Sequence, residues 1–259
     1  WTGDWLQTAG VNTLSADYAC EAGKISRFDL VQEAPKELPT LRSHAMKIAL
    51  FNETGLGEFG PSEVVAGVSY SGARTPLPRF VGKACPELVY LNYDDHDFVK
   101  VRLDPRSLAA AKARLSEIPR ELDRAMLWMV LWEMVQHAEL SAPEYAELLL
   151  RHLPAETNFQ IQTKIAETVY GRRLNSTSLL LLLAGEGEAW RGVFDRESSR
   201  FESFFWGRMT AAAAGTDAQR LWFDGYARVA RSPAAQERLA DLLDGKIKIE
   251  GLEIDQDRR

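Results

Sequence analysis

The hydrophobic pattern of the chain changes period once, at Asp104, and this change constrains the fold class more than any other feature. Before Asp104 apolar residues tend to alternate with polar ones, as in "HAMKIALFN", where Met46, Ile48 and Leu50 lie two apart. After Asp104 they recur three and four residues apart. A two-residue period is typical of strands, and a period near 3.6 is typical of helices. The sequence therefore predicts a β part followed by an α part.

Short strand-like runs and turn-forming residues predict a β-sandwich over residues 12–103. Glycines and prolines gather between the runs, as at Gly55, Gly57, Gly60 and Pro61. Short strands separated by such turns are typical of sandwiches. The strand-like runs are "KISRFDLVQEA", "HAMKIALFN", "SEVVAGVSY", "LVYLN" and "FVKVRL".

Helix signals begin at Asp104, the predicted N-cap, which is followed by Pro105 at the first helical position. A second capped start is expected at Ser232, with Gly245 as the stop signal. The stretch "RELDRAMLWMVLWEMVQHAEL" is apolar nearly all round, so we expect it to be buried between neighbours. Many amphipathic helices with short links predict an array of helical hairpins, an α-solenoid-like layer. Single-face stripes are Tyr145–Leu148–Leu149–His152, Ile161–Ile165–Val169, Trp222–Tyr226–Val229–Ala230 and Ala235–Leu239–Leu242–Leu243.

Both ends of the chain resemble interrupted elements. "WTGDWLQTAG" is typical of the last turns of a helix, with Gly10 as its stop, and "GLEIDQDRR" resembles the entry to another helix or strand. We therefore expect three segments: residues 1–11 as the tail of a preceding helix, 12–103 as a linking sandwich, and 104–259 as a helical domain truncated at its end.

Composition excludes two function classes. Apolar residues make up 46% and charged residues 26% of the chain, which suits a globular protein, and the net charge is −6. We find no basic stripe, so nucleic acid is not an expected partner. The longest apolar runs, Ala125–Trp132 and Leu179–Ala184, are far shorter than the ~20 residues of a membrane span. No signal peptide opens the sequence, so we expect a cytoplasmic protein.

The two cysteines, Cys20 and Cys85, form no Cys-x-x-Cys motif, which excludes that redox or zinc-ribbon signature. We expect two buried, reduced thiols. A disulfide between them is the alternative that the sequence leaves open.

The histidines do not form a zinc helix. A His-Glu-x-x-His motif needs two histidines four apart, and His44, His96, His137 and His152 have no such spacing. Glu133 and His137 are four apart, but we interpret them as an exposed pair at a helix end. His152 lies on an apolar stripe and is expected to be a satisfied core histidine.

The acidic stretch Asp94, Asp95, His96 and Asp97 lies between the strand-like runs "LVYLN" and "FVKVRL". It lacks the glycine and glutamate of a calcium-binding EF-hand loop. Asp and Asn favour tight turns because their side chains bond nearby backbone groups and tolerate left-handed conformations. We therefore predict a hairpin turn, with a weak, adventitious cation site as the alternative.

Other short motifs carry no chemistry either. "GLGEFG" spells the Gly-x-Gly-x-x-Gly fingerprint of dinucleotide-binding folds, but a strand pattern follows it where a helix is required. We predict a flexible hairpin loop instead. There is no Gly-x-Ser-x-Gly elbow. Arg172 and Arg173 are interpreted as complements of a helix C-terminus rather than a phosphate site.

Several stretches together resemble the C-terminal half of the aminopeptidase N family of zinc metallopeptidases, the membrane alanyl and puromycin-sensitive type. "DWLQTAGVNTL" resembles the end of that family's catalytic domain, and "FNETGLGEFGPSEV" departs from the family pattern. The other matching stretches are "LVYLNYDDHDFVKVRLDPRSL", "RAMLWMVLWEMVQHAELSAPEY" and "LLDGKIKIEGLEIDQDRR".

The resemblance implies a supporting role. In that family a His-Glu-x-x-His zinc motif, a further glutamate, a Gly-x-Met-Glu-Asn segment and a tyrosine carry the peptide hydrolysis, and none of these motifs occurs here. We therefore predict no catalytic, cofactor-binding or metal-binding residue in this chain, with zinc in the parent enzyme. The implied partners are an upstream catalytic domain and the peptide substrates of the parent, which the helical part would cap.

Two other functions remain as alternatives. The first is a self-contained interaction module that binds a protein segment in the concave face of its helical array. The second is a stand-alone hydrolase, for which the sequence offers no constellation of side chains.

Overall fold

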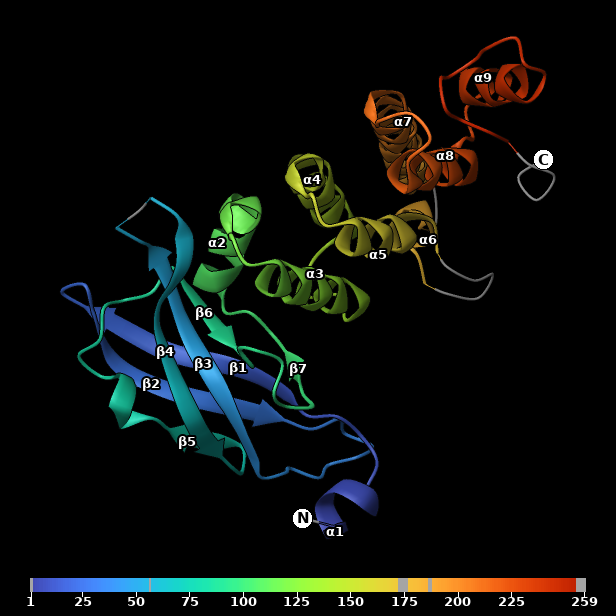
Figure 1. Cartoon of the computed structure of the whole chain (residues 1–259). Helices are drawn as coiled ribbons and strands as arrows, with labels where there is room; N and C mark the ends of the chain where they lie inside the picture. Colours follow the sequence, from blue (N-terminus) through green and yellow to red (C-terminus); the bar gives the residue numbers. More distant parts are fainter. Residues whose placement is uncertain (1, 56, 172–176, 186–187, 255–259) are drawn as a thin grey trace. The chain divides into compact units, whose positions relative to one another are not determined.

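The predicted order of β part and α part is confirmed. A computed structural model of the chain places strands in its first part and helices in its second (Figure 1). It describes residues 2–55, 57–171, 177–185 and 188–254.

A short helix, α1 (Thr2–Leu6), precedes the first strand. It ends before Gly10, the residue at which the sequence placed the stop. Gly10 instead has a positive φ of 98°, a backbone conformation that glycine adopts readily. The element expected after Gly251 falls largely on residues 255–259, which lie outside the described residues.

The strands form two sheets. The first has the order β5-β2-β1-β7, in which β7 pairs parallel to β1 and the other pairs are antiparallel. The second, antiparallel sheet has the order β4-β3-β6. The strands are β1 (Thr13–Glu21), β2 (Lys24–Glu33), β3 (His44–Glu53), β4 (Phe59–Tyr70), β5 (Arg74–Pro76), β6 (Leu88–Leu91) and β7 (Lys100–Val101).

One cluster of buried apolar side chains draws on both sheets. Strict alternation along β2 would send Ile25 and Phe28 to opposite faces, yet both belong to this cluster. The pairing with β1 skips one residue of β2, Ser26, so the chain bulges there and both side chains point inward. The cluster includes Leu14, Leu30, Met46, Ile48, Leu50, Val68, Phe80, Val89 and Leu91.

The expectation of two reduced thiols is wrong, because Cys20 and Cys85 form a disulfide. Cys85 belongs to the segment between the 3-10 helix η1 (Pro78–Phe80) and β6. Its backbone N–H donates to the carbonyl of Gly23, just past the end of β1, at 2.9 Å. This contact helps to bring the two Cα atoms to 5.9 Å, within the range that a disulfide spans.

The outer surface of the first sheet carries a ring of ion pairs. Asp17 on β1 lies directly opposite Asp29 on β2, and two facing carboxylates repel each other. Arg27 and Arg74 each bind both carboxylates. Their hydrogen bonds lower the pKa of Asp17 to about 2, so the ring joins β1, β2 and β5.

The helices begin at the residues that the sequence favours. Asp104 accepts hydrogen bonds from the backbone of Arg106 and Ser107, and Ser232 accepts one from Ala235, so both predicted caps are confirmed. The helices are α2 (Pro105–Arg114), α3 (Glu121–Gln136), α4 (Ala142–His152), α5 (Phe159–Tyr170), α6 (Leu179–Ala184), α7 (Glu188–Ala211), α8 (Asp217–Val229) and α9 (Pro233–Leu243), with the 3-10 helices η2 (Leu115–Glu117) and η3 (Leu153–Ala155).

The predicted stripe of α4 is confirmed, because its four residues are all buried. The prediction for α3 holds on one side only: Leu127, Trp128 and Leu131 are buried, but Met129 is 52% exposed. An apolar residue on the open side of a helix is ordinary when it stands alone. Among the described residues, no helix is long and apolar enough to cross a membrane.

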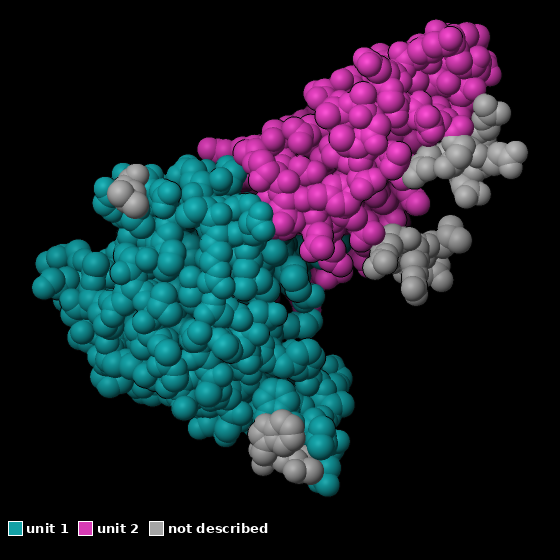
Figure 2. Space-filling model, in the orientation of Figure 1, with its two compact units in different colours: residues 1–134 teal, residues 135–259 magenta. Residues whose placement is uncertain are grey.

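The chain divides into two compact units, residues 1–134 and 135–259 (Figure 2). This division falls within α3. The boundary that the sequence predicts at Asp104, where the period changes, concerns the change from strands to helices and stays a prediction.

The packing of α7 against α8 gives the first prediction. A Cβ atom at Gly225 of α8 would lie 2.4 Å from Cε1 of Phe205, a ring that is fully buried on α7. We expect Gly225→Ala to lower the free energy of unfolding by about 1–3 kcal/mol because the ring has no room to move. Gly207→Ala on α7 is the control, since nothing lies within 4 Å of its added Cβ.

Chemical denaturation of both variants tests this. Gly207→Ala should gain about 0.5–1 kcal/mol from the better helix propensity of alanine. Equal gains for the two variants would contradict the close packing at Gly225.

Candidate functional site

The acidic stretch crosses from one sheet to the other. β6 belongs to the second sheet and β7 to the first, so the predicted hairpin between the two runs is wrong. The conformational part of the prediction is confirmed, because Asn92, Asp94 and Asp95 have positive φ angles of 55°, 67° and 53°. The amide of Asn92 closes the turn by bonding the backbone N–H and carbonyl of Asp97, each at 2.9 Å.

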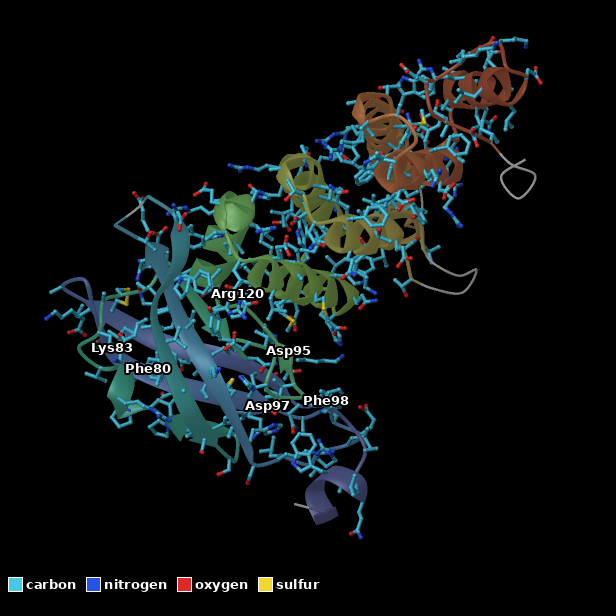
Figure 3. The ribbon with its side chains drawn as sticks, in the orientation of Figure 1. Phe80, Lys83, Asp95, Asp97, Phe98 and Arg120 are labelled. Carbon is cyan, nitrogen blue, oxygen red and sulfur yellow. A yellow bond between two sulfur atoms is a disulfide. The ribbon has the colours of Figure 1, made fainter. Side chains whose placement is uncertain are left out.

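The carboxylates of this crossing segment bind different partners. Asp94 binds Lys47 at 2.7 Å and Arg120 at 2.5 Å, and their hydrogen bonds lower the pKa of Asp94. Asp97 binds His44 and Tyr70 (Figure 3 labels Asp97). Among the described residues, no group of three or more His, Cys, Asp or Glu side chains could hold a metal ion. We therefore assign no metal chemistry to the described residues.

A buried polar cluster surrounds His44, the first residue of β3. Its Nδ1 lies 2.8 Å from Oδ1 of Asp97, and its Nε2 lies 3.4 Å from Oδ1 of Asn12. The hydroxyl of Tyr70 donates to the other oxygen of Asp97 at 2.8 Å. Burial, followed by the nearby charge of Asp97, raises the pKa of Tyr70. Each polar group of this cluster has a partner, as burial requires.

The same cluster holds the segment that leads from α1 into β1. Arg42 donates to the carbonyl oxygens of Thr8 and Ala9, at 3.2 and 3.0 Å, and to the Thr8 hydroxyl at 2.9 Å. Asn12 donates to the carbonyl of Thr40 at 2.8 Å. Trp5 of α1 packs its ring edge-to-face with His44 at 4.9 Å between centroids. We call Asn12, Arg42, His44, Tyr70 and Asp97 the anchor cluster.

A cavity of about 630 Å³ opens beside the anchor cluster. Serine and threonine hydroxyls contribute to its wall, but both ring nitrogens of His44 already face Asp97 and Asn12. The ring is therefore not oriented to activate one of these hydroxyls as a nucleophile. The lining residues are Trp5, Ser43, His44, Ala45, Ser69, Tyr70, Ser71, Thr75 and Asp97.

A second cavity, of about 510 Å³, lies in the helical unit between α5 and α8. Its wall includes the exposed ring of Phe159 and an ion pair of 3.0 Å between Asp217 and Arg220. The wall therefore combines an aromatic ring with charged groups of both signs.

Asp123, in the first turn of α3, is a buried carboxylate with a perturbed pKa. Neither of its oxygens accepts a hydrogen bond from the part of the chain that the structure describes. Arg120 lies 3.6 Å away but binds Asp94 more closely. Burial raises the pKa of Asp123 to about 6, and the nearby Arg120 opposes that shift.

The remaining residues that the sequence singled out lie outside the anchor cluster. Glu133 forms an ion pair with Lys100 at 3.3 Å, and His137 follows the end of α3. His152 is buried as expected. The loop that begins at Gly55 joins β3 to β4, so the predicted hairpin is confirmed. The pair Arg172–Arg173 lies outside the described residues.

Sequence reasoning did not find the anchor cluster. His44 and Asp97 are 53 residues apart, and Asn12 and His44 are 32 apart. No short motif joins such positions. The one available signal was a histidine that begins a strand otherwise rich in apolar residues, because a buried histidine needs partners.

The fold and site define a class of protein: a β-then-α chain whose described residues hold buried polar networks rather than a metal-ligand set. Residues 88–259 match the ERAP1-like C-terminal domain family, and the chain belongs to this family. It is 33% identical over 272 residues to Aminopeptidase N of Streptomyces lividans. The match covers 100% of this chain and 30% of the relative. The predicted resemblance to the C-terminal portion of an aminopeptidase N-type enzyme is therefore confirmed.

The anchor cluster gives the second prediction. Asp97→Asn removes the charge that faces His44. It also places an amide N–H₂ against one of the two groups that bind the carboxylate, Nδ1 of His44 or the hydroxyl of Tyr70. We expect a loss of about 1–3 kcal/mol in the free energy of unfolding. Asp95→Asn, in the same stretch, is the control, because Asp95 is exposed and asparagine tolerates its positive φ. Thermal and chemical unfolding of both variants should separate them, and equal stabilities would contradict the role of Asp97.

Asp123 gives the third prediction. Its folded-state pKa is raised, so its contribution to stability is present below about pH 4 and is lost as the pH rises through about 6. Asp123→Asn keeps the neutral form at every pH. The variant should match the wild type at pH 4 and be more stable by about 2–3 kcal/mol at pH 8.

Asp94→Asn is the control for Asp123→Asn, because both carboxylates face Arg120. The pKa of Asp94 is lowered, so its removal should destabilise the chain at pH 8 and matter least at low pH. Denaturation curves between pH 4 and 8 would contradict the assignment if Asp123→Asn destabilised the chain at pH 8.

Proposed function

We propose that this chain is a non-catalytic C-terminal part of a zinc aminopeptidase whose parent removes N-terminal amino acids from peptides. One observation carries the proposal: the whole chain aligns with less than a third of Aminopeptidase N of Streptomyces lividans. In the proposal, zinc and the hydrolytic residues belong to the rest of the parent.

Residues 12–103 would serve as a β-sandwich that links domains. Support comes from the anchor cluster, which joins residues 5–12 to the start of β3 and to the crossing segment after β6. Arg42 alone makes three hydrogen bonds to Thr8 and Ala9. A segment held by both backbone and side-chain contacts transmits the orientation of what precedes it more rigidly than a free linker.

The preceding part of the parent would pack against the end of the sandwich that carries α1. Leu6 of α1 and Phe98, which directly follows Asp97, are 71% and 70% exposed. Figure 3 shows Phe98 beside Asp97, the residue that pairs with the Trp5-packed ring of His44. Large exposed apolar side chains near an anchored segment suit a surface that another domain covers.

Residues 104–259 would form a solenoid-like helical array that caps the active-site cleft and limits which peptides enter. Support comes from the run of capped, amphipathic helices α4, α5, α8 and α9 and from the family match of residues 88–259. Such arrays commonly present extended binding surfaces.

The predicted cytoplasmic location stays a prediction. A disulfide between Cys20 and Cys85 is uncommon in cytosolic proteins, where thiols are kept reduced. The feature favours either an oxidising compartment or a bond that opens in the cytosol.

The fourth prediction tests whether catalysis belongs to the rest of the parent and not to this chain. The isolated chain, supplied with zinc and a chromogenic aminoacyl substrate, should give no turnover, because its described residues offer no metal-ligand group. A chimera in which this chain replaces the aligned 30% of Aminopeptidase N from Streptomyces lividans should hydrolyse the substrate.

Two controls define the result. The relative without its aligned part should lose activity or stability, and Arg42→Ala in the chimera should lower both by loosening the anchored segment. Turnover by the isolated chain, or a folded chimera without activity, would contradict the proposal.

A further inference from the structure

The disulfide between Cys20 and Cys85 fastens an irregular strap to the first sheet. The strap, residues 81–87, leads from η1 into β6 and therefore connects the two sheets. Both cysteines are partly exposed rather than buried. Cys20 also packs against the apolar cluster of the two sheets. The bond therefore lies at the edge of the core rather than sealed inside it, and this partial exposure leaves it open to a small reagent.

A cation lies against one of the two sulfurs. Nη1 of Arg106 is 3.1 Å from Sγ of Cys85, and Arg106 is the second residue of α2. The neighbouring Asp104 carboxylate is engaged by the backbone N–H groups of Arg106 and Ser107 and by the Ser107 hydroxyl. Tyr18 on β1 also faces these charges, and burial raises the pKa of Tyr18 to about 12, so it stays neutral.

Backbone pairing would keep the strap in place without the disulfide. Lys83 accepts from the N–H of Ile25 at 2.9 Å, and Gly82 donates to the carbonyl of Ile25 at 2.8 Å. Cys85 donates to the carbonyl of Gly23 at 2.9 Å, and Lys24 bridges to Ala84. The two sulfurs would therefore stay near each other after reduction, which allows the bond to form again.

We propose that Cys20 and Cys85 are a reversible thiol–disulfide site that exchanges with small thiols, either glutathione or a dithiol, with Cys85 as the leaving thiolate. A thiolate of the dithiol attacks Sγ of Cys20, the S–S bond breaks, and its electron pair stays on Sγ of Cys85. That thiolate pairs with the guanidinium of Arg106. The first step leaves a mixed disulfide between Cys20 and the dithiol. The second thiolate of the dithiol then attacks the dithiol's own sulfur in that bond. Cys20 is released as a thiolate, and the dithiol leaves as a cyclic disulfide. The protein gains two electrons in total, and its thiols take up protons according to pH.

Arg106 sets the asymmetry of this site. A cation beside a sulfur stabilises the thiolate over the thiol, which makes the sulfur a better leaving group and favours the reduced pair. The inference does not depend on the proposed aminopeptidase role, because it needs only the chain and a thiol reagent.

The test equilibrates the full chain in dithiothreitol redox buffers and in glutathione buffers of cytosolic ratio, and counts free thiols by alkylation and mass spectrometry. We expect the pair to open in the reducing glutathione buffer and to close again on reoxidation. Arg106→Ala should shift the equilibrium toward the disulfide by about tenfold, whereas Arg106→Lys should keep it near the wild-type position. Arg102→Ala, which removes a half-buried cation that pairs with Glu33, is the matched control.

A second measurement separates the charge effect from misfolding. In the Cys20→Ser variant, checked by circular dichroism, alkylation of Cys85 should reach half its maximal rate below pH 8.5, the ordinary thiol value. Adding Arg106→Ala should raise that midpoint by about one pH unit. A disulfide that stays closed in the reducing glutathione buffer, or a midpoint that Arg106→Ala leaves unchanged, would overturn the proposal.

Discussion

The crossing from β6 to β7 is the constraint on which the first unit depends. It carries Asn92, Asp94 and Asp97 from one sheet toward the other, so their polar groups need partners inside the protein. Asn92 closes the turn on itself, Asp94 binds Lys47 and Arg120, and Asp97 binds His44 and Tyr70. A single short segment thereby joins β3, β4, the start of α3 and, through His44, the segment after α1. If its polar groups lost these partners, several elements would loosen together.

The charged residues of this unit differ in how completely opposite charges neutralise them. The ring of Asp17, Asp29, Arg27 and Arg74 neutralises two facing carboxylates at the surface, where each pair contributes little on its own. Asp123 is different, because it is buried and Arg120 is committed to Asp94. Such an incompletely paired carboxylate lowers stability at neutral pH.

Much of the fold was accessible from local sequence patterns. The change of period at Asp104 gave the β-to-α order, and the caps at Asp104 and Ser232 gave two helix starts. These signals work because the backbone groups they satisfy are only a few residues away. The errors came from long-range relations. "LVYLN" and "FVKVRL" resemble a hairpin, yet they pair with different sheets, and strand partners are not encoded by alternation alone.

By itself, the sequence determined the order of strands before helices, the turn conformation of the acidic stretch and the relationship to aminopeptidases, because each rests on neighbouring residues or on collinear similarity. Only the tertiary structure decided which side chains meet. It joined Cys20 to Cys85 across 65 residues, placed Asp97 against His44, and left Asp123 without a hydrogen-bond donor in the described chain. The physical reason is that burial and pairing depend on how strands and helices pack in space. This packing leaves no periodic pattern among neighbouring residues of the sequence.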